Sequence, residues 1–107
     1  MRVWYRVRDL AAARAFYTGK LGFTETYLDE EAGWANLERA GMQIALAEGE
    51  PEDAGVATID VADARAEAER LRAESVEVGT VLDLHNEVRL LDVFDPDGNR
   101  LQLVEEL

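Results

Sequence analysis

The first residues alternate between apolar and polar side chains, which predicts a strand over residues 3–8. Val3, Tyr5 and Val7 share one face of that strand, while a tryptophan and two arginines occupy the other. Asp9 then suits the N-cap of a helix that runs to about Lys20, because its carboxylate can accept hydrogen bonds from free amides. We expect this helix to bury one stripe of residues: Leu10, Ala13, Tyr17 and Leu21.

Three more strands are predicted in the first half of the chain. Residues 23–28 are rich in aromatic and β-branched side chains, and residues 33–39 and 42–48 flank a short turn at Ala40-Gly41. The last of these strands again alternates between apolar and polar or small residues. The first half therefore has the order β-α-β-β-β.

The second half repeats this order. We expect a strand at residues 56–61, a helix from the cap Asp63 to about Ala73, strands near 76–82 and 87–94, and a closing strand. The repeat extends to short segments: Val7-Arg8-Asp9 matches Val61-Ala62-Asp63, and residues 41–46 resemble residues 98–103. The chain is therefore expected to be one domain, 1–107, built from module one (1–50), a linker (49–54) and module two (55–107).

A tight turn at Asp95-Pro96-Asp97-Gly98-Asn99 precedes the closing strand. The proline fixes φ, Gly98 can adopt a positive φ, and the acidic and amide side chains can cap free amides of the turn. Leu101 and Leu103 then alternate with Arg100 and Gln102, which predicts the second strand of a hairpin. Gln102 is thus a polar residue opposite a leucine face.

Composition narrows the classes of partner. The 107 residues carry a net charge of -12, which argues against nucleic acids and anionic membranes as partners. The chain has no cysteine, so disulfides and thiolate chemistry are excluded. Because no long apolar run or signal-like segment is present, we expect a cytoplasmic protein.

Five segments together identify a family: Val7–Leu10, Phe16-Tyr17, Leu21–Phe23, Asp95–Asn99 and Leu101–Leu103. At this spacing they resemble the vicinal oxygen chelate superfamily, which groups glyoxalase I, bleomycin resistance proteins and extradiol dioxygenases. The resemblance implies an α+β fold in which two paired βαβββ modules form a curved mixed-sheet cup with the helices outside. It also implies a homodimer, and leaves open whether modules pair within one chain or are exchanged between two.

The resemblance also locates the positions of a metal site. In metal-dependent members, His or Glu ligands project into the cup, and this chain has Arg2, Ala45, Val56 and Gln102 at the matching positions. Arginine has no lone pair to offer, alanine and valine have no donor atom, and one amide oxygen does not hold a transition metal. The only histidine, His85, lies near a predicted turn and matches no ligand position. We therefore expect no metal and no other cofactor.

Strand alternation predicts which side chains face the cup. Aromatic and hydrogen-bonding groups in a concave site suit a small organic ligand. The candidate ligand-binding residues are Trp4, Arg6, Trp34, Gln43, Thr58, Asp60, Arg100 and Gln102. A structural alternative uses the same residues: the two arginines pair with Asp60 and other acids to close the cup, and Trp4 packs at a dimer interface.

Three functions are compatible with these residues. We expect a metal-free binding protein of the bleomycin resistance type, which sequesters a small organic ligand such as a cationic drug or metabolite attracted by the acidic chain. A divergent glyoxalase-like lyase or other enzyme of the superfamily is an alternative, although the sequence offers no nucleophile–base pair and no catalytic residue is identified. A structural domain that dimerises without a ligand is the third.

Overall fold

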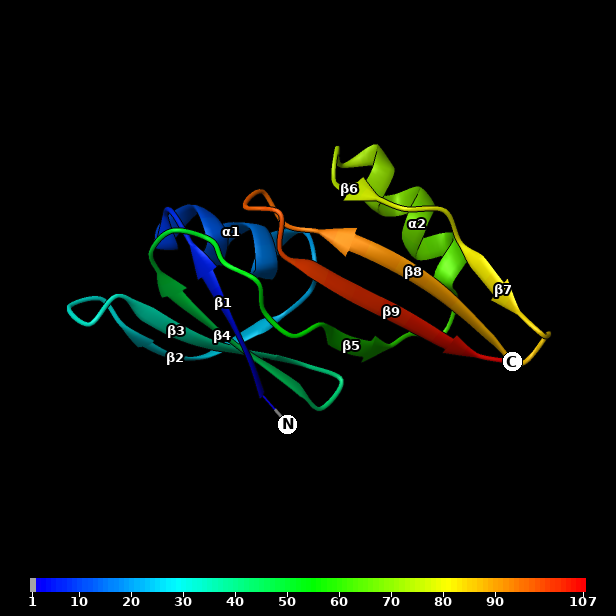
Figure 1. Cartoon of the computed structure of the whole chain (residues 1–107), viewed down its shortest axis with the longest axis horizontal. Helices are drawn as coiled ribbons and strands as arrows, with labels where there is room; N and C mark the ends of the chain where they lie inside the picture. Colours follow the sequence, from blue (N-terminus) through cyan, green and yellow to red (C-terminus); the bar gives the residue numbers. More distant parts are fainter. Residues whose placement is uncertain (1) are drawn as a thin grey trace.

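The computed structural model describes residues 2–107, which form two helices and nine strands in two mixed sheets (Figure 1). Sheet A has the order β1-β4-β3-β2, and β1 (Arg2–Val7) runs parallel to β4 (Met42–Glu48). Strands β3 (Trp34–Arg39) and β2 (Thr24–Asp29) continue the sheet in antiparallel pairing. Helix α1 (Leu10–Gly19) connects β1 to β2 and packs on one face of the sheet.

Sheet B is the corresponding sheet of the second module. Strand β5 (Ala57–Asp60) is parallel to β9 (Arg100–Glu106), and β9 is antiparallel to β8 (Val88–Phe94). Helix α2 (Ala64–Ala73) packs on this sheet, and the short strand β6 (Glu77–Val78) pairs with β8. The predicted α+β fold with two βαβββ modules is therefore confirmed, although the two sheets are separate and do not close.

The prediction of one strand over residues 76–82 is wrong, because two short strands pair with β8 instead. Val78 pairs with Val93, and Leu82, the first residue of β7 (Leu82–Leu84), pairs with Leu90. Three residues thus lie opposite two residues of β8, and the extra residue interrupts the ladder as a bulge does. After β7, His85 is exposed in a turn with a φ of 53°, as expected for a surface histidine.

The two helices begin in the same way, and this reflects the repeat in the sequence. Asp9 accepts a hydrogen bond from Ala12 N at 3.1 Å, and Asp63 accepts one from Ala66 N at 3.0 Å, so both predicted N-caps are confirmed. A second carboxylate comes from the last strand of each module. Glu48 Oε2 accepts from Leu10 N at 3.0 Å, and Glu105 Oε1 accepts from Ala64 N at 2.9 Å.

The turn between β8 and β9 is fastened to the first module. Asp95 is buried and accepts hydrogen bonds from the backbone amides of Asp97 and Asn99, which shapes the turn. Its Oδ2 also accepts a hydrogen bond from the hydroxyl of Tyr17 in α1 at 2.8 Å. Burial raises the pKa of Tyr17 well above its usual value, with the charge of Asp95 adding to the effect. Gly98 has the expected positive φ of 87°.

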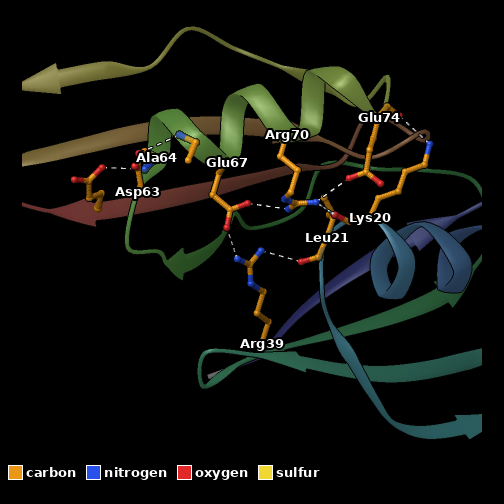
Figure 2. A network of polar contacts seen from close by, with 10 residues as sticks. Lys20, Leu21, Arg39, Asp63, Ala64, Glu67, Arg70 and Glu74 are labelled. Carbon is orange, nitrogen blue, oxygen red and sulfur yellow. Dashed lines mark hydrogen bonds and ion pairs between the residues drawn. The ribbon is translucent and has the colours of Figure 1, made fainter.

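A charged network joins the two modules on their helical side (Figure 2). Glu67 of α2 accepts hydrogen bonds from Arg39 of β3 at 2.7 Å and from Arg70 at 2.8 Å. Arg70 also donates to the carbonyl of Lys20 at 3.0 Å, and Lys20 Nζ donates to the carbonyl of Glu74 at 3.1 Å. This network links the helix of module two to α1 and β3 of module one.

The paired modules form an elongated body of 46 × 27 × 23 Å, with sheet A at one end and sheet B at the other (Figure 1). The core lies between each sheet and its helix, and it includes the predicted stripe of α1 together with Ala68 and Leu71 of α2. Neither helix of residues 2–107 has the length and apolar character needed to cross a membrane. The sheet faces opposite the helices are not covered by either helix.

Candidate functional site

The face of sheet A opposite α1, here called the open face of sheet A, carries an aromatic cluster. The Trp34 ring lies between those of Trp4 and Tyr27, with centroid distances of 5.4 Å to Trp4 and 4.9 Å to Tyr27. Trp4 is 49% exposed and Tyr27 is 50% exposed. Large aromatic side chains are usually buried because of their apolar area, so a cluster of them at the surface indicates a contact site.

Small residues on β4 make room for this cluster. Ala45 pairs with Trp4 on one side and with Asn36 on the other, and Ala47 pairs with Trp34. Ala45 is fully buried even though its side chain points to the open face, because the aromatic rings lie above it. Ala45, at a position where the resemblance implies a metal ligand, therefore lies next to the aromatic side chains of the open face.

Polar side chains surround the aromatic rings. Arg2 lies over the face of Trp4, with the guanidinium carbon 5.9 Å from the ring centroid, and donates to Gln43 Oε1 at 3.4 Å. Asn36 is buried beneath the cluster and donates to Thr26 Oγ1 at 2.8 Å. This face therefore offers aromatic surfaces for stacking with a flat ring, and polar side chains for hydrogen bonds with polar groups attached to that ring.

The open face of sheet B, opposite α2, holds a polar group of a different kind. Gln102 Nε2 donates to Asp92 Oδ1 at 3.2 Å, and Arg100 is 3.4 Å from Asp92 Oδ2. Thr58 pairs with Gln102 across the sheet, and Asp60 is exposed at the end of β5. These side chains form a hydrophilic surface without an aromatic cluster.

A groove runs along the edge of sheet A, between β1 and the linker. Its cavity of about 450 Å³ is lined by Arg2, Trp4 and Arg6 on one side and by residues 52–55 on the other. A smaller cavity of about 220 Å³ continues past Tyr5 toward Arg100. Burial raises the pKa of Tyr5 to about 12, and its hydroxyl donates to the carbonyl of Arg100 and accepts from Ala57 N. Tyr5 therefore ties the two modules together beneath the groove.

In the structural alternative, Arg6 and Arg100 pair with Asp60 and other acids; among residues 2–107 both arginines pair with other acids and neither pairs with Asp60. Arg6 pairs with Glu52 of the linker at 3.5 Å, and Arg100 pairs with Asp92, while no arginine lies within ion-pair distance of Asp60. Exposed ion pairs of this length contribute little to stability. Arg6 and Arg100 thus pair with acidic residues away from the aromatic cluster, and neither arginine covers the cluster.

The residues at the family's metal positions do not fit a metal. Arg2 is a cation held against Trp4, Ala45 is buried without a donor atom, and Val56 precedes β5. Gln102 is engaged with Asp92. No three His, Cys, Asp or Glu side chains of the described chain are grouped so that they could hold a metal ion.

The structure divides the predicted ligand-binding residues between two surfaces. Sheet A carries Trp4, Arg6, Trp34 and Gln43, and brings the tryptophans into contact; sheet B carries Thr58, Asp60, Arg100 and Gln102. Sequence reasoning missed Tyr27, Asn36 and Asp92. The hairpin register indicates Asp92, because a turn at residues 95–99 places it opposite Gln102. Alternation in β3 likewise places Asn36 on the same face as Trp34.

The family model of the Glyoxalase/Bleomycin resistance protein/Dioxygenase superfamily matches residues 2–103. Several solved structures share the fold. A superfamily member from Sphaerobacter thermophilus has a TM-score of 0.83 at 24% identity and covers 98% of this chain and 94% of its own. A fosfomycin resistance protein from Listeria monocytogenes has a TM-score of 0.82 at 19% identity, with 100% and 92% covered.

A bleomycin resistance determinant encoded on the transposon Tn5 has a TM-score of 0.74 at 19% identity, with 99% of this chain and 96% of its own chain covered. No curated protein matches the sequence. At these identities the solved structures show a shared fold, and the family match spans most of the chain. The chain therefore belongs to the Glyoxalase/Bleomycin resistance protein/Dioxygenase superfamily.

Proposed function

We propose that this protein binds a small organic ligand without a metal, on the open face of sheet A and the adjoining groove. The observation that carries the proposal is the exposed cluster of Trp4, Trp34 and Tyr27. A concave site with apolar rings and a few polar groups is the usual setting for ligand binding, and a cavity near 450 Å³ suits a small molecule. The names of the structural relatives support this class, since two of them are a bleomycin resistance determinant and a fosfomycin resistance protein.

We further propose that the protein acts as a homodimer. The exposed large apolar side chains of both modules, Trp4 and Tyr27 on sheet A and Leu82 and Leu84 on sheet B, lie on faces that no part of residues 2–107 covers. A second copy that covers these faces removes apolar area from water and can enclose a ligand. Light scattering during size-exclusion chromatography is expected to give twice the monomer mass; a monomer at all concentrations contradicts this part of the proposal.

The binding proposal is tested by thermal unfolding against a varied panel of aromatic and cationic compounds. A ligand that binds the native state raises the midpoint temperature in a concentration-dependent way. The shift is expected to disappear in Trp34→Ala and to persist in Trp34→Phe, which keeps an aromatic ring. No shift with any compound favours the structural dimer instead. A stoichiometric transition metal in the purified protein contradicts the metal-free part of the proposal.

A further inference from the structure

The side-chain amide of Asn36 lies beneath the aromatic cluster, and its hydrogen bonding is incomplete. Asn36 is only 7% exposed, and its Oδ1 atom has no hydrogen-bond partner among residues 2–107. A buried amide oxygen without a partner is rare, because its desolvation is not compensated. The atom therefore marks a position at which a bound molecule can supply a donor.

The neighbouring hydroxyl determines which atom of Asn36 is left without a partner. Thr26 Oγ1 donates its only proton to the backbone carbonyl of Asn36 at 3.1 Å. It can then only accept from the Asn36 side chain, and Nδ2 donates to it at 2.8 Å. The carbonyl end of the Asn36 amide must point elsewhere, and it can only accept.

The neighbouring amide of Gln43 is oriented by two donors. Gln43 Oε1 accepts from Arg2 at 3.4 Å and from Asn36 Nδ2 at 3.5 Å, so the Nε2 end is turned away from both. This Nε2 atom forms no hydrogen bond with any residue from 2 to 107, and the side chain is only half-buried. Two adjacent amides thus offer one free acceptor and one free donor.

Trp4 and Tyr27 of the aromatic cluster share a row of the sheet with Asn36, and Gln43 lies in the next row. Trp34 contacts Tyr27 and Trp4 on the two outer strands of sheet A, so its ring spans the strands between them, where Asn36 and Ala45 are paired. A flat ring that separates the Trp34 and Trp4 rings and inserts between them reaches the two amides and stacks on both aromatic surfaces.

We propose that the open face of sheet A binds a planar heterocycle with an amide edge, in which an N–H lies beside a C=O. The N–H donates to Asn36 Oδ1, the C=O accepts from Gln43 Nε2, and the ring stacks against Trp34 and Trp4. This inference rests on the proposed function and names the chemistry of its ligand. Arg2 donates to Gln43 Oε1, and the two free groups are an amide oxygen and an amide nitrogen, both neutral. The recognised edge of the ligand is therefore neutral, whereas the net charge of the chain suggests a cationic ligand.

Three bicyclic probes of nearly equal shape test the two hydrogen bonds by isothermal titration calorimetry. The lactam 2-quinolinone has both groups, coumarin replaces the N–H by an oxygen, and quinoline lacks the carbonyl. We expect 2-quinolinone to bind about ten-fold more tightly than coumarin, because coumarin leaves Asn36 Oδ1 unpaired. Coumarin is expected to bind more tightly than quinoline, because its exocyclic carbonyl can accept from Gln43 Nε2, whereas the only acceptor of quinoline is a ring nitrogen in the place of the lactam N–H, opposite the Asn36 acceptor.

A variant assigns the difference between coumarin and quinoline to Gln43. Gln43→Met should remove the preference for coumarin over quinoline, whereas Glu38→Met, a change to the same side chain on the neighbouring strand, should preserve the order of affinities. Equal affinity of all three probes overturns the inference and leaves the proposed function standing. Failure of all three while other panel compounds bind has the same meaning; failure of every compound overturns both.

Discussion

At the scale of single residues, one buried tyrosine of α1 supports the turn before β9. Tyr17 is fully buried in α1 and donates to Asp95 Oδ2, while Oδ1 of the same carboxylate accepts from the backbone amides of Asp97 and Asn99 in the turn. The sequence marks both residues, but as parts of different motifs: a helical stripe and a turn. Their contact depends on how α1 and the β8–β9 hairpin pack, which no local pattern contains.

Tyr17→Phe is predicted to lower the free energy of unfolding by about 1–3 kcal/mol, because a buried carboxylate oxygen loses a donor. Urea denaturation measures the loss. Tyr27→Phe is the matched control, since it makes the same chemical change at a half-exposed ring; its effect is expected to stay within about 0.5 kcal/mol. Equal effects of the two substitutions argue against a stabilising role of the Tyr17–Asp95 hydrogen bond.

At the scale of elements, each helix begins between two carboxylates, one local and one from the end of the module. Glu48 and Glu105 each lie seven residues after the glycine that precedes its strand, Gly41 or Gly98. The internal repeat therefore contains a signal for this second cap. Sequence reasoning did not use it, because capping rules consider only residues adjacent to the helix.

Glu105→Ala is predicted to destabilise the protein by about 1–3 kcal/mol, because the amide of Ala64 is buried and loses its acceptor. Glu106→Ala changes the next residue, which is exposed, and is expected to cost no more than about 0.5 kcal/mol. Chemical denaturation of both variants provides the comparison. A small effect at Glu105 is incompatible with a role for its carboxylate in starting α2.

At the scale of the whole molecule, Glu67 connects the modules and makes their pairing sensitive to acid. Burial alone raises the pKa of Glu67, but hydrogen bonds from Arg70 and Arg39 outweigh it, and the pKa is lowered overall. A carboxyl whose pKa is lower in the folded state stabilises that state above its unfolded pKa. This contribution is lost as the pH falls through the lowered, folded-state value.

Glu67→Gln removes this titration and is predicted to flatten the loss of stability as the pH falls below about 5. Near neutral pH the variant should be less stable than the wild type by about 1 kcal/mol, since two charged hydrogen bonds are weakened. Denaturation at a series of pH values gives both results. The control Glu69→Gln, on the exposed side of the same helix, should show the same dependence of stability on pH as the wild type. If Glu67→Gln also shows the wild-type dependence, Glu67 does not contribute to the acid sensitivity.

The sequence by itself determined the modules, because alternation, N-caps and turn residues act over a few positions along the chain. It placed both helices and the first four strands, and the repeat of one module predicted the order of the second. The failure at residues 76–82 has a local cause: one extra residue opposite β8 splits the strand, and apolar alternation does not register such a bulge.

The tertiary structure decided how the functional side chains are grouped. Alternation gave the facing of Trp4 and Gln43, but the contacts of Trp34 with Trp4 and Tyr27 depend on strand order, which brings together residues far apart in the chain. The free oxygen of Asn36 depends on a bulge in β2 that brings Thr26 to it. Side-chain periodicity is a local property of the backbone, whereas hydrogen-bond saturation and stacking arise only when separate strands meet.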